Sequence, residues 1–190
     1  GAAVGEPTEC ALVAWAAALG MTKDQLEQEL PRVAEVPFDS GRKMMSTLHK
    51  TGNSFIQYTK GAPDVVLDRC THYRKDGQVL PMDEAARKEI MAQNKAMADK
   101  ALRVLAVAQR LWDAPPADAE SDTWEQQLTF LGLAGMIDPV RPEVVDAVAQ
   151  CRQAGIQPVM ITGDHKDTAV AIARTLGILN DESQAITGAQ

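Results

Sequence analysis

Residues 36–64 read VPFDSGRKMMSTLHKTGNSFIQYTKGAPD, and this stretch decides the fold. Two strand-like runs flank residues 51–53, Thr-Gly-Asn, which suit a hairpin turn. An antiparallel return would bring Phe38, near one end of the stretch, close to Lys60 near the other. An aromatic ring can stack on a nucleobase and a lysine can neutralise phosphate. Taken singly, however, each residue fits the commoner pattern of a core phenylalanine or a surface lysine.

Together, the segments FDSGRKMMS at 38–46 and KGAPD at 60–64 resemble the nucleotide-binding domain of P-type cation-transporting ATPases. The resemblance implies that Phe38 stacks on adenine and that Lys60, with Gly61 beside it, lines the same pocket. It also implies that Arg42 contributes to the pocket, although the residue alone reads equally as a solvated strand edge.

Two further segments extend the resemblance. Residues 5–9, Gly-Glu-Pro-Thr-Glu, are similar to a family segment whose final glutamate hydrogen-bonds the adenine amino group, a role that falls to Glu9 here. Without the resemblance, Glu9 is a first-turn carboxylate that suits a helix dipole. Arg103 lies in an apolar run, 102–108, where an arginine needs an edge, a partner or a ligand. The run resembles a family strand whose arginine reaches the nucleotide phosphates or ribose.

The order of elements predicts two domains. Hairpins with inserted helices over 1–137 indicate an α+β fold, an antiparallel sheet flanked by helices, as in the nucleotide-binding domain of the resembled family. The pattern changes at Asp138. A helix beginning at Pro142, a strand over 156–161 and a further helix indicate a partial parallel α/β, HAD-like segment over 138–190. The resemblance makes this second part a piece of a phosphorylation domain.

The second part carries its own candidate site. A Thr-Gly turn after a parallel strand can bind phosphate through backbone N–H groups and a hydroxyl, although a plain helix cap has the same sequence. Residues 160–164 resemble the Met-Ile-Thr-Gly-Asp motif of P-type ATPases, which implies that Thr162, Gly163 and Asp164 hold the transferred phosphoryl group. Residues 138–141 are similar to the family's interdomain hinge, which adds Asp138 to the nucleotide-site candidates.

Composition limits the classes of partner. The net charge of −7 argues against nucleic acid. The apolar segment 10–19 is too short to span a bilayer. Three widely spaced cysteines, Cys10, Cys70 and Cys151, indicate reduced, mostly buried thiols, and no Cys/His spacing suggests a metal site. The chain begins at Gly1 without a methionine, and we interpret it as part of a longer protein.

The resemblance implies a function. The family's phosphorylated aspartate motif is expected before Gly1 and its magnesium motif after Gln190, so the chain should bind ATP, with Mg²⁺, but not turn it over. The parent would couple ATP hydrolysis, through an aspartyl-phosphate, to cation transport, with calcium the favoured ion. Its expected partners are ATP and the parent's membrane and phosphorylation domains. The expected location is the cytoplasmic side of a bacterial plasma membrane.

The sequence argues against two other classes of protein. A free-standing HAD-like phosphohydrolase would share the fold of the second part, but no Asp-x-Asp nucleophile motif follows a strand. A P-loop nucleotidase or kinase would need Gly-x-x-x-x-Gly-Lys-[Ser/Thr], which the sequence lacks.

Overall fold

The computed structural model describes residues 5–116, 121–137, 140–163, 166–181 and 185–186. It divides into two compact units, one of residues 1–88 and 105–134 and the other of residues 89–104 and 135–190. The predicted domain boundary at 137/138 stays a prediction. None of the described helices has both the length and the apolar character needed to cross a membrane.

The elements are α1 (Pro7–Ala18), α2 (Lys23–Glu29), β1 (Arg32–Asp39), β2 (Met44–Thr51), β3 (Ser54–Gly61), α3 (Pro63–Asp68), β4 (Cys70–Lys75), β5 (Gln78–Pro81), α4 (Glu84–Ala98), β6 (Arg103–Trp112), α5 (Ser121–Trp124), β7 (Leu128–Met136), α6 (Pro142–Gln153) and α7 (Lys166–Thr175).

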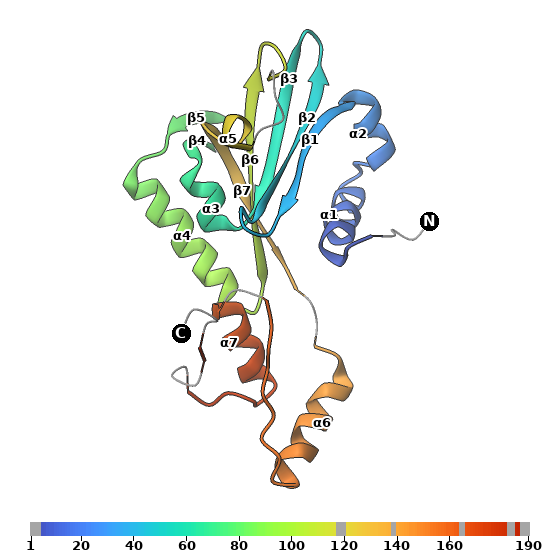
Figure 1. Cartoon of the computed structure of the whole chain (residues 1–190), viewed down its shortest axis with the longest axis vertical. Helices are drawn as coiled ribbons and strands as arrows, with labels where there is room; N and C mark the ends of the chain where they lie inside the picture. The colour runs from blue at the N-terminus through green and yellow to red at the C-terminus, as the bar shows by residue number, and fades with distance from the viewer. Residues whose placement is uncertain (1–4, 117–120, 138–139, 164–165, 182–184, 187–190) are drawn as a thin grey trace. The chain divides into compact units, whose positions relative to one another are not determined.

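A seven-stranded sheet in the order β1-β2-β3-β6-β7-β4-β5 organises the first unit (Figure 1). Strands β1 to β3 and β6 pair antiparallel, as do β4 and β5. Strand β4, however, runs parallel to β7, so the sheet is mixed and the predicted antiparallel arrangement is wrong at this pair. Parallel neighbours need a long crossover, and here the chain passes through β5, α4, β6 and α5 between them.

The predicted hairpin is confirmed as β2 and β3, which pair in unbroken register from Met44↔Gly61 to Thr51↔Ser54. The residues before it form a separate strand, β1, which a turn over residues 40–43 joins to β2. The Asp39 carboxylate sets this turn by accepting hydrogen bonds from the backbone N–H groups of Gly41 (3.0 Å) and Arg42 (2.9 Å). Phe38 therefore lies on β1, beside the hairpin.

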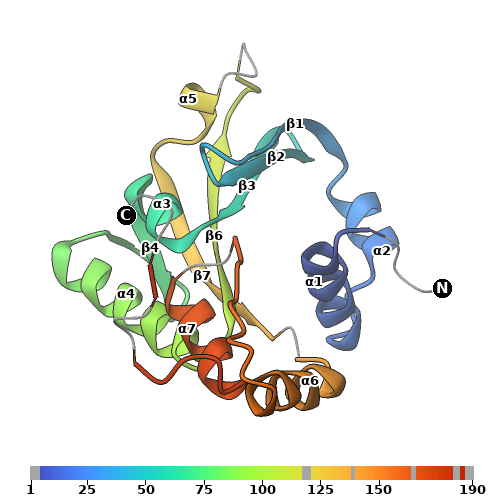
Figure 2. The same ribbon diagram turned by 60° about the horizontal axis from the view of Figure 1, so that its bottom comes forward.

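The two faces of β2 and β3 differ in burial. Every second residue points into the core, including Met44 and Leu48, which are 1% exposed. The alternate residues form a half-buried face. Helices α1 and α2 lie on one side of the sheet and α3 on the other (Figures 1 and 2). A hydrogen bond of 2.9 Å between His49 Nδ1 and the carbonyl of Leu30 ties the end of α2 to the half-buried face.

The second unit contains α6, which begins at the predicted proline, and α7. The strand predicted over 156–161 is wrong, because these residues form no regular element. Val159 is 77% exposed and Ile161 92% exposed. A strand exists only where a neighbour supplies its hydrogen bonds, and none of the described residues pairs with this run. The predicted parallel α/β arrangement is therefore not confirmed.

Candidate functional site

Phe38 lies on a β-bulge in the edge strand β1. Val36 pairs with Ser46 and Asp39 with Met44, so three steps along β1 match two along β2. Pro37 and Phe38 therefore both lie opposite Met45. Phe38 is 62% exposed. The alternative of a core phenylalanine is wrong, and the ring is available to stack on a flat ligand.

Lys60 lies on the other side of Met45, with which it pairs across β2 and β3. Phe38 and Lys60 are thus two strands apart in one row of the sheet, a backbone separation of roughly 9.6 Å for two strand spacings. The antiparallel return brings the two residues near each other, as the sequence predicted. Lys60 alternates with the buried Thr59, so its side chain belongs to the half-buried face.

Glu9 joins this row from α1. Its carboxylate forms an ion pair with Lys60 Nζ, and the two side chains are 50% and 24% exposed, respectively. Tyr58 lies two residues before Lys60 on the same face, and burial raises the pKa of its hydroxyl above the ordinary value of 10.0. Three of the predicted residues, Glu9, Phe38 and Lys60, are thus gathered at one end of β1, β2 and β3.

Gly61 fixes the path of the chain beside Lys60. A Cβ added at Gly61 would lie 2.6 Å from Met44 Cβ, and the carbonyl oxygen of Lys43 would be closer still. The next residue, Ala62, donates its N–H to that same carbonyl (2.9 Å). Only glycine lets β2 and β3 approach this closely, so Gly61 contributes by placing Lys60.

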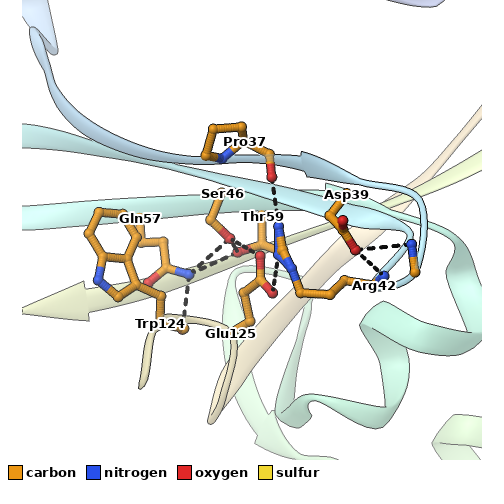
Figure 3. Close-up of polar contacts among 9 residues, drawn as sticks. Pro37, Asp39, Arg42, Ser46, Gln57, Thr59, Trp124 and Glu125 are labelled. Carbon is orange, nitrogen blue, oxygen red and sulfur yellow. Dashed lines mark hydrogen bonds and ion pairs between the residues drawn. The ribbon is translucent and has the colours of Figure 1, made fainter. Parts of the chain in front are cut away.

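The Arg42 side chain turns toward Glu125 and the Pro37 carbonyl (Figure 3). Its guanidinium lies 3.3 Å from the Glu125 carboxylate, and Glu125 in turn accepts a hydrogen bond from Ser46 (3.3 Å) on the core-facing side of β2. Ser46 and Lys60 belong to opposite faces of the sheet. The structure therefore does not bring the Arg42 guanidinium together with Glu9 and Lys60.

A buried polar chain continues from Glu125 through the sheet (Figure 3). Ser46 bonds Thr59 at 2.8 Å, and Gln57 Nε2 donates to Thr59 at 2.9 Å and to the Trp124 carbonyl at 3.0 Å. Ser46, Gln57 and Thr59 are fully buried, and Glu125 is 2% exposed. Among the residues that the structure describes, no buried side-chain polar atom is left without a partner. The hydrogen-bonding groups of this buried polar network are therefore satisfied, and the network is rigid.

Sequence reasoning missed Glu125 altogether. The residue lies between α5 and β7 and belongs to no recognisable motif. A signal was nonetheless present, because Ser46, Gln57 and Thr59 all fall on the core-facing side of a hairpin. Three buried polar side chains need partners, which indicates that another polar group must reach them from elsewhere in the chain.

The remaining predicted residues lie elsewhere. Arg103 begins β6, is exposed and falls in the second unit. Thr162 and Gly163 are exposed and outside any regular element. Asp138 and Asp164 lie outside the described residues. Within the described ranges, no group of three His, Cys, Asp or Glu residues could hold a metal ion.

The mixed sheet, with its exposed aromatic and its lysine–glutamate pair, belongs to a known class of domain. Residues 1–143 match the family model described as "P-type ATPase, cytoplasmic domain N". The chain therefore belongs to the P-type ATPase family, as its motifs predicted.

Relatives with assigned names are similar over almost the whole chain. The chain is 47% identical to calcium-transporting ATPase 1 of Bacillus cereus over 98% of its length, and 42% identical to calcium-transporting ATPase 1 of Lactococcus lactis over 99%. It is 43% identical to cation-transporting ATPase pma1 of Synechocystis over 93% of its length. The chain spans about a fifth of these relatives, 21%, 21% and 19% of their respective lengths.

Proposed function

We propose that this chain is the ATP-binding part of a cation-transporting P-type ATPase. The observation that carries the proposal is the row in which the exposed Phe38 and the Glu9-paired Lys60 flank Met45. This row combines a ring for stacking, an acceptor and a cation within reach of one small ligand.

Each residue then has a chemical role. Adenine stacks on Phe38, and its exocyclic amine donates to the Glu9 carboxylate. Lys60 faces the ribose and phosphates and supplies a compact positive charge. The Lys60–Glu9 ion pair is partly solvated. Nucleotide can therefore replace this ion pair at low cost, because the adenine amine becomes the partner of Glu9 and the phosphates become the partners of Lys60.

The parent protein, by this proposal, transports a cation through an aspartyl-phosphate intermediate. Calcium is the proposed ion because two of the similar proteins are named calcium-transporting ATPases. Thr162, Gly163 and Asp164 would hold the transferred phosphoryl group, and Asp138 would lie at the hinge. Mg²⁺ would enter with the ATP phosphates and neutralise their charge. The parent would lie in a bacterial plasma membrane with this part on the cytoplasmic side.

An ATP titration by calorimetry, with and without Mg²⁺, tests the proposal. Phe38→Ala should weaken binding about ten- to a hundredfold, because loss of one stacked base costs roughly 1–3 kcal/mol. Lys60→Ala should weaken binding of ATP more than that of adenosine. Leu111→Ala is the matched control, since Leu111 is also exposed (67%) but lies opposite Ile56, four residues along β3 from Lys60. Absence of binding by the folded, unmutated chain would refute the proposal.

A further inference from the structure

We propose that Arg42, anchored by Glu125, is a positioning residue that fixes the orientation of Phe38, and that it does not itself contact the nucleotide. The inference rests on the proposed function, because Phe38 matters only if it receives the base. It assigns the Arg42–Glu125 pair a role in binding that neither residue performs by touching the ligand.

Arg42 holds both neighbours of Phe38 (Figure 3). Its Nη2 donates to the Pro37 carbonyl at 2.6 Å, directly before Phe38. Its backbone N–H donates to Asp39 Oδ1 at 2.9 Å, directly after Phe38. One residue therefore secures the bulge on both sides of the aromatic ring.

Strand pairing alone leaves this bulge poorly fixed. The register of β1 against β2 is irregular between Val36 and Asp39. Pro37 has no N–H to donate to a neighbouring strand, and among the described strands β1 lies at the edge of the sheet, paired with β2 alone. The hydrogen bonds from Arg42 supply the restraint that a regular ladder would otherwise provide.

Glu125 makes Arg42 a rigid anchor. One carboxylate oxygen faces Arg42 Nη1 at 3.3 Å, and the other accepts from Ser46 Oγ at 3.3 Å. The Glu125 side chain is 3% exposed and that of Arg42 is 23% exposed. A planar guanidinium can serve Glu125 and Pro37 at once, which a lysine ammonium at the end of a flexible stem does less well. The position of Pro37 is thereby tied to the buried core.

The same geometry argues against a direct phosphate contact. The positive charge of Arg42 is balanced by a carboxylate that is almost fully buried. That pair lies on the side of the sheet occupied by Ser46, whereas Lys60 belongs to the opposite face. The sheet would therefore separate a phosphate near Lys60 from Arg42. The charge of Arg42 is also already neutralised by Glu125, so it would attract the phosphate little.

The test compares adenosine with ATP. Arg42→Ala and Glu125→Gln should each weaken both ligands by the same factor, about three- to tenfold, because stacking is impaired and no phosphate contact is lost. In a Phe38→Ala background, either change should alter affinity less than twofold. Glu125→Gln keeps the side-chain size, so it serves if Arg42→Ala fails to fold. Arg42→Lys should restore part of the affinity.

A second readout needs no ligand. In ¹⁵N-labelled, nucleotide-free protein, the backbone amide resonances of Phe38 and Gly41 should shift or broaden in Arg42→Ala and Glu125→Gln. Unchanged resonances would overturn the inference. A loss of affinity in Arg42→Ala that is confined to ATP and spares adenosine would also overturn it. So would a double variant of Arg42 and Phe38 whose loss of affinity equals the product of the two single losses. Failure of the proposed function itself would look different. The unmutated chain would then bind neither adenosine nor ATP, or Phe38→Ala would bind both ligands as tightly as the unmutated chain does.

Discussion

Arg42 and Glu125 are 83 positions apart in the sequence, yet their guanidinium and carboxylate lie 3.3 Å apart inside the first unit. The pair joins the turn after β1 to the segment before β7. The ion pair is therefore a long-range contact, which links two segments that no local sequence signal connects.

Breaking this ion pair from one side should destabilise the fold. Arg42→Ala removes the cation that faces the buried Glu125 carboxylate and should lower the free energy of unfolding by about 3–5 kcal/mol. The double variant Arg42→Met/Glu125→Gln should cost less than the sum of its single changes, since no charge stays buried. Urea denaturation of the four proteins measures both effects. Strict additivity would show that the two residues stabilise the fold independently.

Gly61 should not tolerate even one added methyl group. Gly61→Ala places a Cβ 2.6 Å from Met44 Cβ, and overpacking of this kind costs roughly 1–3 kcal/mol. Gly132→Ala is the control, because its added Cβ meets nothing within 4 Å. Thermal melts of both variants should show a loss only for Gly61→Ala. Equal melting temperatures would mean that β2 can shift to make room.

Lys60 should matter for binding and little for stability. Its ion pair with Glu9 is partly exposed, and such pairs contribute about 0–1 kcal/mol. Lys60→Met and Glu9→Gln should therefore each change the free energy of unfolding by less than about 1 kcal/mol. Lys60→Met should also reduce the salt dependence of ATP binding, measured by titration between 50 and 300 mM salt. An unchanged salt dependence would place the phosphates away from Lys60.

Cys70 should make stability fall at alkaline pH. Burial raises the pKa of its thiol from 9.0 to about 12, and the nearby Arg87 lowers it by a smaller amount. The folded protein therefore keeps the proton up to about pH 12, whereas the unfolded chain begins to lose it near pH 9. The stabilisation is complete below pH 9 and declines between pH 9 and 12, by up to about 1.4 kcal/mol per pH unit.

Urea denaturation at pH 8 and pH 10 checks this slope, with Cys70→Ala as the comparison. The variant should lose less stability between the two pH values than the unmutated chain. Burial also raises the pKa of Tyr58, but that contribution is common to both proteins and cancels in the difference. Parallel losses in the two proteins would contradict the assignment.

Local signals in the sequence predicted much of the first unit. Thr22 and Gln25 form a capping box at the start of α2, and the Asp83 carboxylate accepts a hydrogen bond from the Ala86 N–H at 2.7 Å at the start of α4. The hairpin turn at 51–53 sets the register of β2 and β3. These features depend on residues a few positions apart, so propensity and turn chemistry suffice.

Features that depend on distant partners were not predictable in the same way. The parallel pairing of β4 with β7 brings Cys70 opposite Leu128, and nothing local to either residue encodes it. The run at 156–161 has the composition of a strand but forms none, because strand formation needs a partner. For the site, the motifs predicted that Phe38 and Lys60 are close, but not that Arg42 turns toward Glu125.

The bulge at Pro37 and Phe38 also affects how the protein behaves among other copies of itself. An unpaired edge strand can template the addition of a strand from another molecule, which is a common route to aggregation. β1 is such an edge. Here it is kinked by an extra residue and lacks one hydrogen-bond donor at Pro37. The irregularity that exposes the aromatic ring therefore also protects the sheet from intermolecular strand addition.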